Sequence, residues 1–253
     1  MNEVRNKAMR RRSWLGAGAA LAGLCWTPLR GAARPVLPLA IGDGSPREFV
    51  LPLLQLVAEG GDFDWDLHFL PWARLLAQAG RGDMLAFGLS RNERRERQLL
   101  FSEAVFTNHV WLVVRAGEPA VFAGLESLRG RTLCLTRGVS YGAAFDAAHE
   151  QQLFRSQQVS LDLSGRLRML AARRCDALPT SHRSPDPAVL ERRLRERGAA
   201  EGSIVVQRPP MHQESIHFVA ARGHGQLAAA LSLVDAGLRA RRPAIQALVA
   251  QAD

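Results

Sequence analysis

Residues 71–106 read PWARLLAQAGRGDMLAFGLSRNERRERQLLFSEAVF. The pattern predicts a helix over 72–78, a glycine-aspartate turn, and a buried strand over 84–89. A charged turn follows, and Arg95 lies in it, just past the end of the strand. Because open α/β sheets bind ligands beyond the carboxyl ends of their strands, this segment predicts a site for an anionic small molecule.

The rest of the chain continues the alternation of apolar strands and helices in two series. The second series follows a linker-like break at 115–119, and Pro209-Pro210 forms another break before the last strand. Such alternation is typical of an α/β fold with mostly parallel sheets flanked by helices. We therefore expect two lobes joined by two hinge crossovers, with lobe 1 at 34–114 and 213–253 and lobe 2 at 115–212. The predicted strands are 36–41, 65–69, 84–89, 110–114, 132–136, 159–163, 176–180, 203–206 and 215–220.

The first 33 residues have the features of an export signal. Three arginines at 10–12 precede an uncharged apolar run at 13–28, and Ala32-Ala33 provide a small-residue cleavage site. The run is short for a membrane span. The arginines resemble a twin-arginine motif, and an ordinary secretory signal is the alternative. We expect a periplasmic protein.

Charge and cysteine content narrow the function classes. Positions 1–33 hold six basic residues and one acid, so their removal lowers the formal net charge from +9 to +4. The arginines are scattered and lack clustered aromatic partners, which argues against nucleic-acid binding. Cys134 and Cys175 lack the spacing of a metal site, and they either form a disulfide or are two small buried residues. The histidines show no metal-binding spacing, and we expect no metal or cofactor.

Several motifs occur together in an order found in a known family. They are Gly82-Asp83 before a strand, Leu89-Ser90 at its end, Glu93 with Arg95, Phe101-Ser102, residues 125–130, the Gly138–Gly142 loop and the 172–177 helix-to-strand step. In this order the chain resembles the type 2 periplasmic solute-binding proteins, in particular family 3, which serves amino-acid uptake by ABC transporters. The resemblance implies a monomer that delivers a small solute to an ABC permease in the inner membrane.

The resemblance also assigns ligand-binding residues. Arg95 matches the arginine that binds the ligand carboxylate through a bidentate, charge-assisted pair. Ser90 matches a hydroxyl or backbone contact, and Ser140 matches a residue that binds the same carboxylate near a helix N-terminus. From the residues alone, an arginine in the run 91–97 would be a solvated charge.

One family position differs in this chain. Where the family has an acid that pairs with the ligand ammonium, this chain has Ser181. Either His182 or Asp186 supplies a substitute, or the ligand is not an α-amino acid, and we favour the second interpretation. Trp72 and Tyr141 are the candidates for an aromatic wall of the pocket, with Trp72 equally consistent with the core.

Two enzymatic alternatives are considered. The Gly138–Gly142 segment fits G-x-S-x-G, in which Ser140 would be a nucleophile with a later acid and His212 or His217. Arg137 separates this segment from its strand, and no oxyanion-hole segment of the His-Gly-Gly type precedes it. A small-carboxylate dehydratase on the same fold would need a buried acid where Ser181 stands. We expect a binding protein without catalysis.

Overall fold

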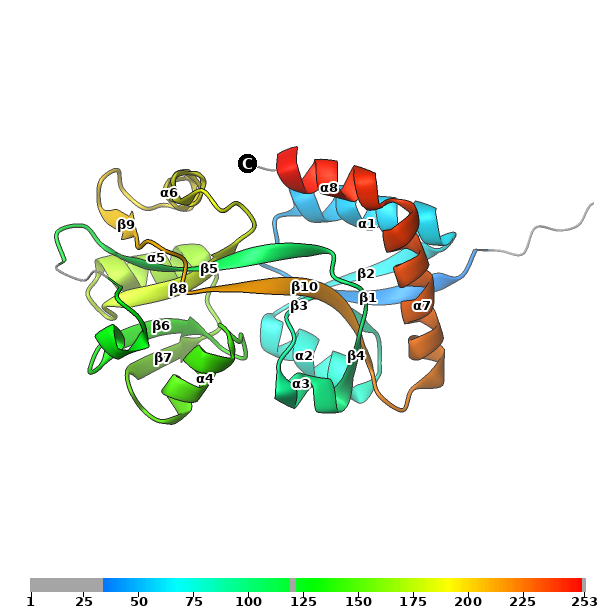
Figure 1. Ribbon diagram of the computed structural model, residues 1–253, viewed down its shortest axis with the longest axis horizontal. Coiled ribbons are helices and arrows are strands. Elements are labelled where there is room, and N and C mark those ends of the chain that lie inside the picture. The colour runs from blue at the N-terminus through cyan, green and yellow to red at the C-terminus, as the bar shows by residue number, and fades with distance from the viewer. Residues whose placement is uncertain (1–33, 119–121, 252–253) are drawn as a thin grey trace, which may run out of the picture. The chain divides into compact units, whose positions relative to one another are not determined.

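A computed structural model describes residues 34–118 and 122–251 of the chain. The predicted export signal at 1–33 lies outside the described residues. The described part belongs to a single compact unit. It contains a ten-stranded mixed sheet with helices packed on it (Figure 1).

The first half of the chain alternates strands and helices as expected. The helix and strand predicted at 72–78 and 84–89 are present with bounds shifted by at most a few residues. Asn92 caps a short helix in the charged turn, since its side chain accepts a hydrogen bond from the backbone of Arg95. The elements are β1 (Val36–Gly42), α1 (Arg47–Gly61), β2 (Asp64–Leu70), α2 (Trp72–Arg81), β3 (Leu85–Leu89), α3 (Glu93–Gln98), β4 (Leu99–Phe101) and β5 (Phe106–Arg115).

The second half differs from the expectation at one strand. The strand predicted at 159–163 lies at β7 (Arg155–Val159), and Leu163 begins a helix that Asp162 caps. This strand was misplaced because it is a polar edge strand without the apolar pattern of a buried one. The elements are η1 (Leu125–Leu128), β6 (Thr132–Thr136), α4 (Ala143–Glu150), β7, α5 (Leu163–Ala171), β8 (Ala177–His182), α6 (Pro187–Glu196), β9 (Ile204–Val206), β10 (His212–Ala221), α7 (Gly225–Ala240) and α8 (Arg242–Gln251).

The strands follow the order β2-β1-β3-β10-β5-β8-β6-β7, with β4 on β10 and β9 on β5. The pairs that β1 forms with β2 and β3, and that β6 forms with β7 and β8, are parallel. The long strands β5 and β10 are antiparallel to each other and to their other neighbours. The predicted mostly parallel sheet is therefore a mixed sheet, because the two strands that run between its halves reverse direction.

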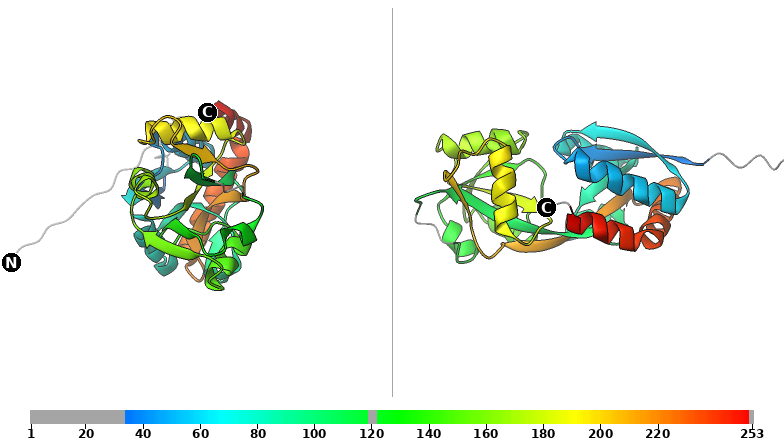
Figure 2. Two further views of the ribbon diagram at one scale, coloured as in Figure 1. Left: turned by 90° about the vertical axis from the view of Figure 1, so that its left-hand side faces the viewer. Right: turned by 90° about the horizontal axis from the view of Figure 1, so that it is seen from above.

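Buried hydrophobic residues form separate clusters at the two ends of this sheet. At one end, Leu39 of β1 and Leu53 of α1 pack with Val234 of α7. At the other end, Leu133 of β6 packs with Phe145 of α4. Figure 2 shows α8 lying beside α1 on the first half. Each half thus buries its own apolar surface, which is the main stabilising contribution to folding.

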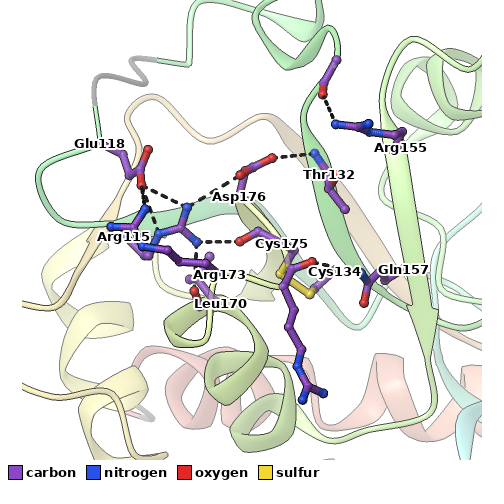
Figure 3. A network of polar contacts seen from close by, with 12 residues as sticks. Arg115, Glu118, Thr132, Cys134, Arg155, Gln157, Leu170, Arg173, Cys175 and Asp176 are labelled. Carbon is purple, nitrogen blue, oxygen red and sulfur yellow. Dashed lines mark hydrogen bonds and ion pairs between the residues drawn. A yellow bond between two sulfur atoms is a disulfide. The ribbon is translucent and has the colours of Figure 1, made fainter.

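A disulfide and a largely buried arginine hold the second half together (Figure 3). Cys134 of β6 and Cys175, just before β8, form the disulfide. At the end of β5, Arg115 donates to the carbonyl oxygens of Leu170 at 2.9 Å and Cys175 at 2.6 Å. It also forms an ion pair with Glu118 at 3.0 Å. Together these contacts attach the turn between α5 and β8 to the central strands.

Candidate functional site

A cavity of about 610 Å³ lies where the carboxyl ends of several strands meet. From the first half, the segments that follow β1 and β2 and residue Gly88 of β3 line it. From the second half, the segments that follow β6 and β7 and the end of β8 line it. This is the place where α/β sheets bind small ligands. The cavity is the candidate functional site.

Positive charge predominates on the wall of this cavity. Five arginines and two aspartates line it. The carboxylate of Asp162 already accepts a hydrogen bond from the backbone of Gly165 at 2.8 Å, as the cap of α5. Such a surface favours an anionic ligand, because each guanidinium can bind an oxyanion through charge-assisted hydrogen bonds. The arginines are Arg137, Arg166, Arg183, Arg193 and Arg197, and the aspartates are Asp43 and Asp162.

Trp72 lies on the cavity wall and connects the two halves of the sheet. Its indole nitrogen donates a hydrogen bond of 3.1 Å to the carbonyl of Gly138, in the loop after β6. The ring occupies space that glycines leave open. A Cβ added at Gly42 would lie 3.3 Å from the ring, and one at Gly138 would lie 3.6 Å from it. Trp72 therefore lines the site wall and also packs against the core cluster that contains Leu75.

Arg95 is buried behind this wall, and only 9% of it is exposed. Its Nη1 donates to the carbonyl of Ser90 at 2.9 Å and to the hydroxyl of Ser90 at 3.2 Å. Its Nη2 donates to the carbonyl of Gly138 at 3.3 Å. Trp72 and Arg95 thus bind the same carbonyl group from the first half of the sheet. Arg95 itself is not among the residues that line the cavity.

Glu214 of β10 supplies a carboxylate to this site, and the sequence patterns did not identify it. The hydroxyl of Ser181 donates to its Oε1 at 3.3 Å, and Oε2 is buried without a hydrogen-bond partner among the described residues. Burial raises the pKa of Glu214, while hydrogen bonds from Ser90 and Ser181 and the charge of Arg95 oppose that rise. Burial likewise lowers the pKa of Arg95, and Glu214 opposes this effect. Glu214 and Asp146 are therefore the nearby negative charges of Arg95.

The signal for Glu214 was present but lay outside the predicted strand. The apolar run predicted a strand from 215, whereas β10 begins at His212. An acid inside a paired strand, opposite Asn108 of β5, would have been a candidate site residue. Without that register, Glu214 is an ordinary polar residue near a loop.

Ser140 and Tyr141 lie in the loop before α4 but face other partners. The hydroxyl of Ser140 hydrogen-bonds to the carboxylate of Asp146, which also accepts from the backbone of Tyr141 at 3.2 Å. The Tyr141 hydroxyl accepts a hydrogen bond of 3.0 Å from the backbone of Thr136, and its ring packs against Phe145 in the core. Neither residue lines the cavity.

The arrangement of Ser140 does not resemble that of a hydrolase nucleophile. A nucleophilic serine needs a histidine in contact with its hydroxyl. Within the described ranges, Ser140 has a hydrogen bond to an acid and none to a histidine. The ring of His212 lies close to Gly142, and the buried His217 contacts the carbonyl of Ser102 instead.

The predicted site residues thus divide into two groups. Two of them line the cavity, and the others lie in the polar layer or the core behind it. A chain of polar contacts through Glu214 connects the two groups. The cavity residues are Trp72 and Ser181, and the residues behind are Ser90, Arg95, Ser140 and Tyr141.

Comparison with solved structures identifies the fold. An ancestral arginine-binding protein bound to arginine superposes with a TM-score of 0.71 at 15% identity, over 87% of this chain and 98% of that chain. The substrate-binding protein of an amino acid ABC transporter superposes with a TM-score of 0.67 at 15% identity, over 85% of this chain and 98% of that chain. The chain has the periplasmic-binding-protein fold. The resemblance expected from the sequence is confirmed at this level.

The same fold also occurs in a protein of another kind. A histidine kinase sensor domain with similarity to periplasmic binding proteins matches with a TM-score of 0.70 at 20% identity, over 87% of this chain and 96% of that chain. No family model matches the chain, and no curated protein matches it. At these identities the likeness shows the periplasmic-binding-protein fold alone.

The described residues contain neither a membrane-spanning helix nor a metal-binding group. Across 34–118 and 122–251, no helix is long and apolar enough to cross a membrane. In the same part of the chain, no group of three or more histidine, cysteine or acidic side chains is arranged to hold a metal ion.

Proposed function

We propose that this protein is an exported solute-binding protein that captures a small carboxylate-bearing anion in the arginine-lined cavity. Lobe 1, at 34–114 and 213–253, and lobe 2, at 115–212, close over the ligand by motion of the strands between them. An ABC permease of the inner membrane receives the ligand. The protein acts by binding and needs no cofactor.

The observation that carries this proposal is the position and charge of the cavity. It lies at the carboxyl ends of the strands, and five arginines face two aspartates on its wall. The fold supports the same function, because its solved examples include a substrate-binding protein of an amino acid ABC transporter. A sensor domain shares the fold, so the permease is the part of the proposal that rests on resemblance alone.

Arg95 is the proposed anchor for the ligand carboxylate. Its Nη2 binds the carbonyl of Gly138 at 3.3 Å, a long hydrogen bond that a carboxylate oxygen would replace favourably. Trp72 would have to release the same carbonyl for the ligand to reach Arg95. In this proposal, the ligand carboxylate and the carbonyl of Gly138 compete for the guanidinium of Arg95, so ligand binding replaces one contact between the two halves.

The remaining predicted residues orient the ligand. Ser90 provides a hydroxyl group that contacts Arg95, and the hydroxyl of Ser181 contacts Glu214. Ser140 would have to release the carboxylate of Asp146 for its hydroxyl to contact the ligand. Trp72 forms the aromatic side of the site, and Tyr141 supports the loop before α4 from the core behind it. The buried disulfide supports export, because such bonds form and persist in oxidising compartments such as the periplasm.

A thermal-shift screen of small carboxylates against residues 34–253 tests this proposal. A carboxylate that binds the folded state raises the Tm by mass action. Arg95→Ala should abolish that rise, since it removes the charge that the carboxylate binds. Arg97→Ala, an exposed arginine of the same short helix, is the matched control and should leave the rise intact. A full response from Arg95→Ala would show that the carboxylate binds elsewhere.

A further inference from the structure

Arg166 is a buried arginine on the wall of the cavity. It lies in the first turn of α5, and only 7% of it is exposed. Its Nη1 donates to the carbonyl of Pro179 at 2.8 Å. Its Nε is buried without a hydrogen-bond partner, and no ion pair of Arg166 occurs among the described residues. A buried guanidinium with a single hydrogen bond is a costly arrangement, because a buried charge is normally paired.

Two other arginines with little exposure, one buried and one largely buried, have counter-charges. Arg115 forms ion pairs with Glu118 at 3.0 Å and with Asp176 at 3.7 Å. Arg95 has Glu214 as a nearby negative charge and makes three hydrogen bonds. Arg166 is at least as buried as these two arginines and forms no ion pair among the described residues.

No carboxylate among the described residues forms an ion pair with Arg166. Asp162 lies one helical turn earlier and lines the same cavity, and its Oδ1 accepts a hydrogen bond from the backbone of Gly165 instead of from Arg166. The hydroxyl-bearing Thr180 and Ser181 of β8 also line the cavity. Another arginine, Arg137, reaches the same space from the loop after β6. The space in front of Arg166 is therefore rich in hydrogen-bond donors.

We propose that Arg166 binds a second anionic group of the ligand, so that the ligand is a small dicarboxylate. The inference rests on the proposed function. Arg95 takes one carboxylate at the polar layer behind Trp72, and Arg166 takes the other from the opposite half of the cavity. A monocarboxylate would leave Arg166 buried and without a counter-charge. The protein should thus select ligands by the number of their negative charges.

The first test uses the unmodified protein, residues 34–253, and isothermal titration calorimetry. Succinate and glutarate are compared with butyrate and valerate, which match them in chain length and lack the second carboxylate. A hydrogen-bonded contact to a charged group predicts a Kd for the better dicarboxylate at least about tenfold lower than for its matched monocarboxylate. Equal affinities would overturn the inference and leave the proposed function intact. Absence of binding by all four compounds would overturn both.

Substitution then assigns the selectivity to this side chain. Arg166→Gln should abolish the preference by raising the Kd of the dicarboxylate to about that of its matched monocarboxylate, because the second contact is lost. Arg168→Gln removes an exposed arginine from the same helix and should retain the full preference. Arg166→Lys keeps the charge and should retain part of the preference, which separates a charge effect from a general loss of packing. A full preference in Arg166→Gln would overturn the assignment.

Discussion

Removing the disulfide should reduce the free energy of unfolding by about 4 kcal/mol. Cys134 and Cys175 are 41 residues apart in sequence, and both are buried, with exposures of 0% and 1%. In the chain-entropy model, closing a loop of this length removes about 13 cal/mol/K from the unfolded ensemble, or about 4 kcal/mol at room temperature. Because a domain is stable by only about 5–15 kcal/mol, C134A/C175A should lose a large fraction of its stability.

Urea unfolding followed by far-UV circular dichroism measures this loss. The oxidised protein and C134A/C175A are compared, each with and without dithiothreitol. Reduction should lower the stability of the oxidised protein to about that of the variant, and the variant should not respond to the reductant. A loss below about 1 kcal/mol would refute the entropic argument. A response of the variant to dithiothreitol would show that reduction acts elsewhere.

Two further predictions concern the site and the core. Glu214→Gln should change the pH dependence of stability. Burial raises the pKa of Glu214 in the folded state above its ordinary value of 4.5. The stabilisation that Glu214 contributes to the folded state is therefore complete below pH 4.5 and is lost as the pH rises through the raised pKa. The Tm of E214Q relative to the unmodified protein should therefore increase between pH 4 and pH 8, and a constant difference would contradict the raised pKa. Gly237→Ala should destabilise by more than about 2 kcal/mol in urea unfolding, since its added Cβ would lie 2.1 Å from the carbonyl of Val57. The matched Gly80→Ala has open space at its Cβ and should be neutral or stabilising by up to about 1 kcal/mol, so equal effects of the two would disprove the close contact of α1 with α7.

Local patterns predicted most of the elements of the fold. The helix that follows Pro71 and the strand that ends at Leu89 depend on periodicity and on turn residues that lie within the same segment. The edge strand β7 was misplaced because it is polar, and its position follows from pairing with β6. A polar edge strand is determined by pairing with the neighbouring strand, and its own residues lack the apolar pattern by which a strand is predicted from a single sequence.

The candidate site also contains one residue that could be predicted from the sequence and one whose role only the structure shows. Arg95 was singled out by the family resemblance, because an arginine in the run 91–97 would otherwise be a solvated charge, and the structure buries it against Ser90. The unpaired state of Arg166 could not be predicted, because an arginine in a helix is solvated unless the packing around it excludes water. Burial is a property of the assembled cavity rather than of the residue.

The sequence by itself determined the alternation of strands and helices, the break between the two series, and an arginine beyond the end of β3. All of these depend on residues close together in the chain. Only the tertiary structure decided that Cys134 meets Cys175 and that Glu214 lies against Ser181. Those contacts arise from the pairing and register of β5, β6, β8 and β10, which join segments far apart in sequence. The site therefore depends on which strands pair, and the sequence patterns do not specify that pairing.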